Sequence, residues 1–94
     1  MMIDMDSKSF LKSKKNNNVY HLFDDKIVVQ TSHGEKEIPL PVDPTSFKYY
    51  TDFYYMFYEG DKLFAVVQTR SFSDMRFEVD EDTLELKGKP IPTR

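Results

Sequence analysis

Two histidines and two acidic runs have the clearest capacity for chemistry in this chain. His21 and His33 are the side chains that ordinarily titrate near neutral pH, but the expected strands place them several residues apart, so they should not share a metal ion. The acidic runs at residues 24–25 and 80–82 fall at expected hairpin turns, where aspartate is common. The second run has Leu84 where a calcium loop needs its third oxygen ligand. We therefore expect neither a metal ion nor another cofactor.

Catalytic and phosphate-binding motifs are missing from the sequence. No serine lies in a G-x-S-x-G turn, and Gly34, Gly60 and Gly88 are too far apart to form a phosphate-binding loop. Without cysteine the chain has no disulfide and no thiolate ligand, which fits a reducing cytoplasm. These features favour a non-enzymatic, cytoplasmic protein.

The charge pattern gives little indication of a partner. The net charge is −3, and the one cationic cluster comprises Lys8, Lys12, Lys14 and Lys15. We interpret this cluster as a solvated leader rather than a nucleic-acid-binding arm. No apolar run is long enough to cross a membrane, and no secretory signal precedes residue 19.

The stretch "YYTDFYYMFY", residues 49–58, is the strongest functional candidate. In a strand, Tyr54, Met56 and Tyr58 would share one face, which we assign to the core. The opposite face would then be apolar as well, and we name it as the candidate binding or interface site: Phe53, Tyr55, Phe57, Phe64 and Val66. Because large exposed apolar patches are uncommon on monomers, something should cover this face. The chain itself, a protein partner, a second copy or a stacked ligand are the alternatives.

The elements that would position this face are short strands. In the first half, "VYHLF", "KIVVQTS" and "EKEIPLP" are separated by turns at residues 24–25 and 33–34. The first turn opposes Leu22 to Ile27 and Tyr20 to Val29. The second opposes Val29 to Ile38 and Ile27 to Leu40. All six of these side chains fall on one apolar face.

The second half gives four more strands. "DFYYMFY" and "KLFAVVQTR" flank a turn at Gly60-Asp61, which opposes Tyr58 to Leu63 and Tyr54 to Val67. "MRFEV" and "TLELK" flank residues 81–82, which opposes Val79 to Leu84. The total is about seven antiparallel strands, and we expect an all-β meander folded as a strongly bent sheet or a small sandwich.

The word "VVQT" occurs at residues 28–31 and again at 66–69. In the expected registers Tyr20 and Tyr54 each oppose the second valine of their copy, and each hairpin carries "DK" at its turn. We interpret this as an unequal structural repeat over residues 19–41 and 53–92, with a linker at 42–52. The segment "KLFAVV…MRFEVDEDTLEL" resembles one blade of a β-propeller, a likeness that implies an antiparallel meander and no activity. Two incomplete repeats are too few to close a propeller.

Residues 1–18 are expected to be flexible or loosely attached through Phe10 and Leu11, with a short helix over residues 8–15 as the alternative. Residues 19–94 should form one domain. The function that we predict is a small interaction or regulatory protein, which could form a homodimer through the aromatic face. The rivals are a carbohydrate or other small-ligand binder that stacks on tyrosine, and a less favoured nucleic-acid-binding module.

Overall fold

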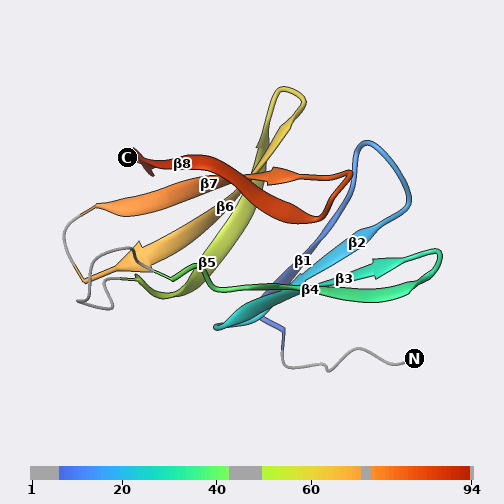
Figure 1. Ribbon diagram of the computed structural model, residues 1–94, viewed down its shortest axis with the longest axis horizontal. Coiled ribbons are helices and arrows are strands. Elements are labelled where there is room, and N and C mark those ends of the chain that lie inside the picture. The colour runs from blue at the N-terminus through green and yellow to red at the C-terminus, as the bar shows by residue number, and fades with distance from the viewer. Residues whose placement is uncertain (1–6, 43–49, 71–72, 94) are drawn as a thin grey trace.

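The computed structural model describes residues 7–42, 50–70 and 73–93, which form strands and no helix. The strands are β1 (Ser9–Lys12), β2 (Val19–Leu22), β3 (Lys26–Thr31), β4 (Gly34–Pro39), β5 (Tyr50–Glu59), β6 (Lys62–Thr69), β7 (Asp74–Asp80) and β8 (Glu85–Thr93). Strands β1–β4 form a first antiparallel sheet and β5–β8 a second, each in chain order (Figure 1). Among the described residues, therefore, none lies in a helix that could cross a membrane.

The all-β prediction is confirmed, but the count of seven strands is wrong. The eighth strand is β1, which lies within the segment 1–18 and pairs with β2. The helix considered over residues 8–15 does not form. The edge of β2 supplies backbone partners for this segment, including Leu22 O, which accepts from Lys8 N at 2.7 Å. Leu11 adds an apolar contact with the core. The expected bend and the repeat stay predictions.

The two sheets share one hydrophobic core. The first sheet contributes Tyr20, Leu22, Ile27, Val29 and Ile38, and the second contributes Phe53, Leu63, Ala65, Val67, Phe77, Val79 and Leu84. Tyr20 and Phe53 are the largest of the fully buried side chains. Each fully buried large apolar side chain stabilises a fold by about 1.5–3 kcal/mol relative to leaving it exposed. This shared burial holds the sheets together.

In the first sheet the expected apolar face is confirmed, although one register is wrong. Leu22 opposes Ile27 and Tyr20 opposes Val29 as expected. Ile38, however, opposes Ile27 rather than Val29. The turn is Ser32-His33 rather than His33-Gly34, because Thr31 Oγ1 closes it by donating to Gly34 O and accepting from His33 N. The partner shifts by two residues, so every side chain keeps its face.

In the second sheet a β-bulge changes which side chain of β5 enters the core. Glu59 opposes Lys62 and Tyr58 opposes Leu63 as expected, across the turn at Gly60. The register then shifts between Phe53 and Tyr55, so that Phe53, not Tyr54, opposes Val67. Phenylalanine has no hydroxyl group that would need a buried partner. Tyr54 is instead 50% exposed.

The β7–β8 turn is longer than expected. Residues 81–84 connect Asp80 to Glu85, and Val79 opposes Leu86 rather than Leu84. Asp80 Oδ1 accepts hydrogen bonds from the backbone N–H groups of Asp82 and Thr83, and Leu84 N donates to Asp80 O at 2.7 Å. Leu84 has a φ of 60°, a conformation that non-glycine residues adopt mainly in such turns. This conformation directs the side chain of Leu84 into the core and places Glu81 beside the core.

Candidate functional site

Aromatic rings follow one another across the outer face of the second sheet. The ring centroids of Tyr54 and Tyr55 are 5.1 Å apart, those of Tyr55 and Phe57 are 5.8 Å apart, and those of Phe57 and Phe64 are 5.5 Å apart. These separations fall in the range of favourable aromatic pairs. We call these four residues the aromatic row. Its β5 end is solvent-exposed, because Tyr54 is 50% and Tyr55 41% exposed.

The five site residues predicted from sequence do not all lie together. Tyr55, Phe57 and Phe64 belong to the aromatic row, and Val66 opposes Tyr55 in the sheet register. Phe53 does not belong to this face, because the bulge turns it into the core, where it is fully buried. Val66 and Phe64 are themselves buried. The accessible part of the predicted site is therefore Tyr55 and Phe57, with Tyr54 added by the bulge.

Arg76 covers the other end of the row. Its guanidinium carbon lies 4.6 Å from the centroid of the Phe64 ring, a cation–π contact. A terminal nitrogen lies 3.4 Å from Glu59 Oε1. Its buried Nε has no hydrogen-bond partner among the described residues. The row thus combines aromatic rings with an arginine, the residue types that dominate binding energy at protein interfaces.

A second cluster gathers around the carboxylate of Glu81, which is 9% exposed. Its Oε1 accepts hydrogen bonds from Ser13 Oγ at 2.7 Å and from the hydroxyl of Tyr20 at 2.9 Å. The hydroxyl of Tyr58 lies 3.0 Å from both carboxylate oxygens. Hydrogen bonds to a charged group are stronger than those between neutral groups. Glu81 therefore joins β2, β5 and the β1–β2 loop at one point.

This environment shifts the titration of two tyrosines. Burial raises the pKa of Tyr20 far above its usual value, and the hydrogen bond to Glu81 and its charge raise it further. Burial also raises the pKa of Tyr58, against the hydrogen bonds with Lys14 N and Ser13 that lower it, and Glu81 adds a smaller effect in the raising direction. Both hydroxyls consequently stay protonated and keep donating to the carboxylate.

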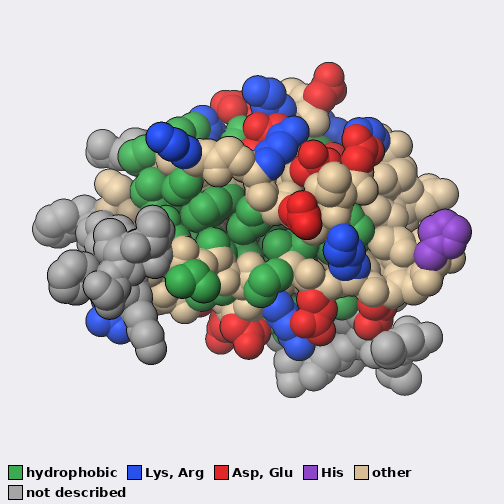
Figure 2. Space-filling model, viewed as in Figure 1, with side chains coloured by type: hydrophobic (Ala, Val, Ile, Leu, Met, Phe, Trp, Pro, Cys, Tyr) green, Lys and Arg blue, Asp and Glu red, His purple; other side chains and the backbone are tan. Residues whose placement is uncertain are grey.

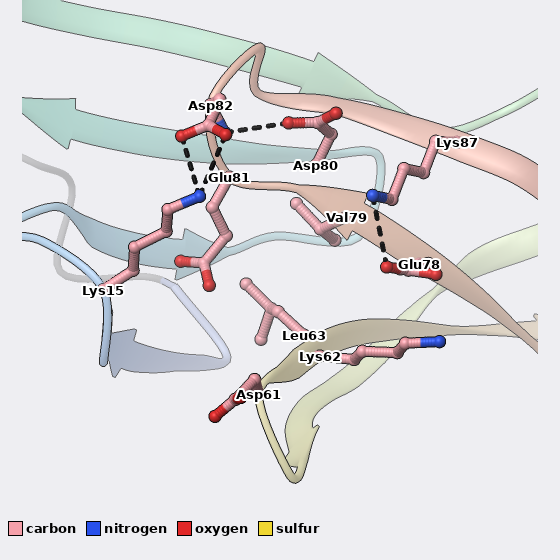
Figure 3. Close-up of a pocket in the computed structure, with 10 residues that line it drawn as sticks. All are labelled: Lys15, Asp61, Lys62, Leu63, Glu78, Val79, Asp80, Glu81, Asp82 and Lys87. Atoms are coloured by element: carbon pink, nitrogen blue, oxygen red, sulfur yellow. Dashed lines mark hydrogen bonds and ion pairs between the residues drawn. The ribbon is translucent and has the colours of Figure 1, made fainter.

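The β1–β2 loop is fixed against this cluster. Ser13 Oγ accepts from the backbone N–H groups of Lys15 and Asn16 while it donates to Glu81. Lys15 Nζ lies 2.9 Å from Asp82 Oδ1, and Figure 3 shows this ion pair beside the Glu81 side chain. The pocket drawn there has a volume of about 130 Å³, and its lining contains five acidic and three basic side chains. It is large enough for a few water molecules only.

No local sequence pattern indicates the Glu81 cluster directly. The acidic run that contains Glu81 is typical of a solvated turn, and Ser13 lies 68 positions away in the chain. One indirect signal existed, because Tyr20 and Tyr58 were both placed on core faces, and a buried tyrosine hydroxyl needs a partner. Within the described residues no three acidic or histidine side chains are placed to hold a metal ion.

An apolar groove lies between the edge strands β4 and β8. Its apolar lining comprises Ile38, Pro39, Pro41, Leu84 and Leu86, and its volume is about 370 Å³. Figure 2 shows hydrophobic side chains gathered in the middle of this face, with charged side chains around them. Lys36 Nζ donates to Thr83 O at 2.9 Å and so links the two sheets beside the groove.

Comparison of this chain with protein-family models, with curated proteins and with solved structures finds no match.

Proposed function

We propose that this chain is a small non-enzymatic interaction protein that binds a protein surface through the aromatic row, and that the surface it binds is the same row of a second copy. The single observation that carries this proposal is the continuous contact of Tyr54, Tyr55, Phe57 and Phe64, exposed at one end and covered by Arg76 at the other. Tyrosine, phenylalanine and arginine are enriched at protein interfaces.

The charges around the row favour a neutral partner surface. Arg76 is paired with Glu59, and Lys87 lies 3.3 Å from Glu78 on the same face of the sheet. Because these charges already balance one another, the face presents no net sign to steer an acidic or basic partner. A face that is apolar and internally neutral is complementary to another copy of itself, as a two-fold interface requires.

The geometry of the exposed rings argues against ligand stacking. Tyr54 and Tyr55 meet edge to face, with an interplanar angle of 71°. A sugar ring or a nucleobase stacks best on a flat, open aromatic face. The edge-to-face pair gives a ridge instead, which suits insertion into a complementary protein surface.

The test is sedimentation velocity over a series of protein concentrations, on the wild type and on Tyr55→Glu. We expect a concentration-dependent dimer for the wild type and a folded monomer for the variant, because the new charge would be buried unpaired in the interface. Phe10→Glu is the matched control, since Phe10 is 71% exposed on the first sheet.

A wild-type protein that stays monomeric at every concentration contradicts the proposal. So does a dimer that Phe10→Glu disrupts and Tyr55→Glu leaves intact. Circular dichroism on each variant checks that the charge has not unfolded the domain.

A further inference from the structure

Three connections between strands meet at one end of the molecule and enclose a cleft of about 480 Å³. The β1–β2 loop supplies Asn16, Asn17 and Asn18, β3 and its turn supply Thr31, Ser32 and His33, and the β7–β8 turn supplies Glu81, Asp82 and Leu84. Figure 1 shows these connections toward the same side of the molecule, at the right of the view. The volume falls within the range of about 300–1,000 Å³ that is typical of small-molecule sites.

Some of these side chains shape the cleft and are already engaged. Asn16 Oδ1 accepts from Asn18 N at 2.9 Å, which fixes the β1–β2 loop. Thr31 Oγ1 closes the β3–β4 turn. Glu81 is engaged by the three hydroxyls described above. These contacts hold the walls in place without a ligand, which lowers the entropy that a ligand must overcome on binding.

Other side chains on the cleft are free to bind. Within the described residues, the side chains of Asn17, Ser32 and His33 make no hydrogen bond, and all three residues are exposed. Together they offer an amide, a hydroxyl and an imidazole, each of which can both donate and accept. Their ligand should therefore carry closely spaced groups that do the same.

The charge of the cleft selects against anions. Its lining contains no lysine or arginine, but it contains the carboxylates of Glu81 and Asp82. Lys15, which pairs with Asp82, is not part of the lining. A phosphate or carboxylate ligand would meet two like charges, of which only that of Asp82 is offset, by Lys15 from outside the lining. An apolar ligand would pair with none of the free side chains of Asn17, Ser32 and His33. What fits is a neutral ligand that is rich in hydroxyl groups.

We propose that this cleft binds a neutral saccharide, through Asn17, Ser32, His33 and the free lone pairs of Asp82. Adjacent sugar hydroxyls match donors and acceptors from one loop and two turns, and the carboxylate accepts without requiring a formal charge on the ligand. This site contains no residue of the aromatic row, so a failure of the proposed interface would not contradict it.

The test is a titration of ¹⁵N-labelled protein, followed by amide chemical shifts, with glucose, galactose and N-acetylglucosamine. Glucose 6-phosphate is the anionic counterpart, and an array of neutral oligosaccharides extends the panel. We expect saturable shifts at the amides of Asn17, Ser32 and His33 with at least one neutral sugar. Glucose 6-phosphate should bind more weakly than glucose.

Two variants locate the site. Asn17→Ala and Ser32→Ala should each weaken binding roughly three- to tenfold, as expected for the loss of one hydrogen bond. Ser7→Ala, which lies outside the cleft lining, should leave binding unchanged. The proposal is overturned if neither the titrations nor the array detects binding. It is equally overturned if the shifts centre on Tyr54 and Tyr55, or if glucose 6-phosphate binds more tightly than glucose.

Discussion

Replacement of Glu81 by alanine should destabilise the protein strongly, although Glu81 lies in a turn. The substitution removes the acceptor of Ser13, Tyr20 and Tyr58. Tyr20 is fully buried, so its hydroxyl would lose its partner without gaining water, which costs about 1–3 kcal/mol. Ser13 is 8% exposed and should add a similar loss, of about 1–3 kcal/mol. Tyr58 is only half-buried and can turn to solvent. Relief from burying a charge offsets part of this sum.

The net loss that we expect is about 2–4 kcal/mol. The free energy of unfolding of a domain this size is on the order of 5–15 kcal/mol, so the loss is a large share of it. Urea unfolding followed by circular dichroism measures the change. With a slope of about 1–3 kcal/mol per molar urea, a loss of about 3 kcal/mol lowers the midpoint by roughly 1–3 M.

The matched control is Asp82→Asn at the neighbouring position. Asp82 is exposed, and its ion pair with Lys15 is solvent-screened, so this variant should unfold close to the wild type. If Glu81→Ala and Asp82→Asn shift the urea midpoint equally, the buried carboxylate does not stabilise the fold and the reasoning is refuted. A double-mutant cycle with Tyr20→Phe then measures the coupling directly, and a value near zero would point the same way.

The remaining predictions concern alkaline pH, the bulge and the contact between the sheets. The pKa of Tyr20 is raised in the folded state, so the stability that its protonated hydroxyl contributes is complete below the usual tyrosine pKa of about 10 and is lost as the pH rises above it. Alkaline unfolding, followed by tyrosinate absorbance, should therefore begin above pH ~10 and should depend less steeply on pH in Tyr20→Phe. Phe53→Ala should cost about 3–5 kcal/mol and Tyr55→Ala less than about 1 kcal/mol in urea unfolding, and the reverse order would place Phe53 on the surface. Lys8 Nζ lies 2.8 Å from Asp52 Oδ2 and also donates to Phe53 O, so Lys8→Met should lower the free energy of unfolding by about 1 kcal/mol. A loss that persists in high salt would show that the hydrogen bond to the carbonyl, and not the screened ion pair, supplies this stability.

The sequence predicted which face of a strand each side chain occupies better than it predicted the cross-strand partner of each residue. Alternation along a strand fixes which side chains point to the core, and a turn that slips by two residues preserves that alternation. This is why Ile38 and Val79 are buried as expected although their cross-strand neighbours differ. The choice of turn depended on local contacts of Thr31 and Asp80 that the residue types alone did not determine.

The errors at the candidate site have a physical cause. A single extra residue at the bulge reverses the facing of the residues just before it in β5, so Phe53 takes the core position expected for Tyr54. Strand β1 carries only Phe10 and Leu11 as apolar residues, a signal too weak to predict a strand by itself. The burial of Glu81 depends on Ser13 from the other half of the chain, and no local pattern encodes such a contact.

The order of the strands has a consequence for folding. In each sheet every strand pairs with its neighbour in the chain, so each half of the sequence completes its own hydrogen-bond ladder through local contacts, which form quickly. The contacts that join the halves, such as Lys8 with Asp52 and Ser13 with Glu81, link positions far apart in sequence. The first sheet can thus pair on the ribosome before the second has been synthesised, while the core faces of both stay open to solvent until the two halves meet. Residues 1–42 and 50–94, made as separate fragments, should then reassemble with second-order kinetics into one folded complex.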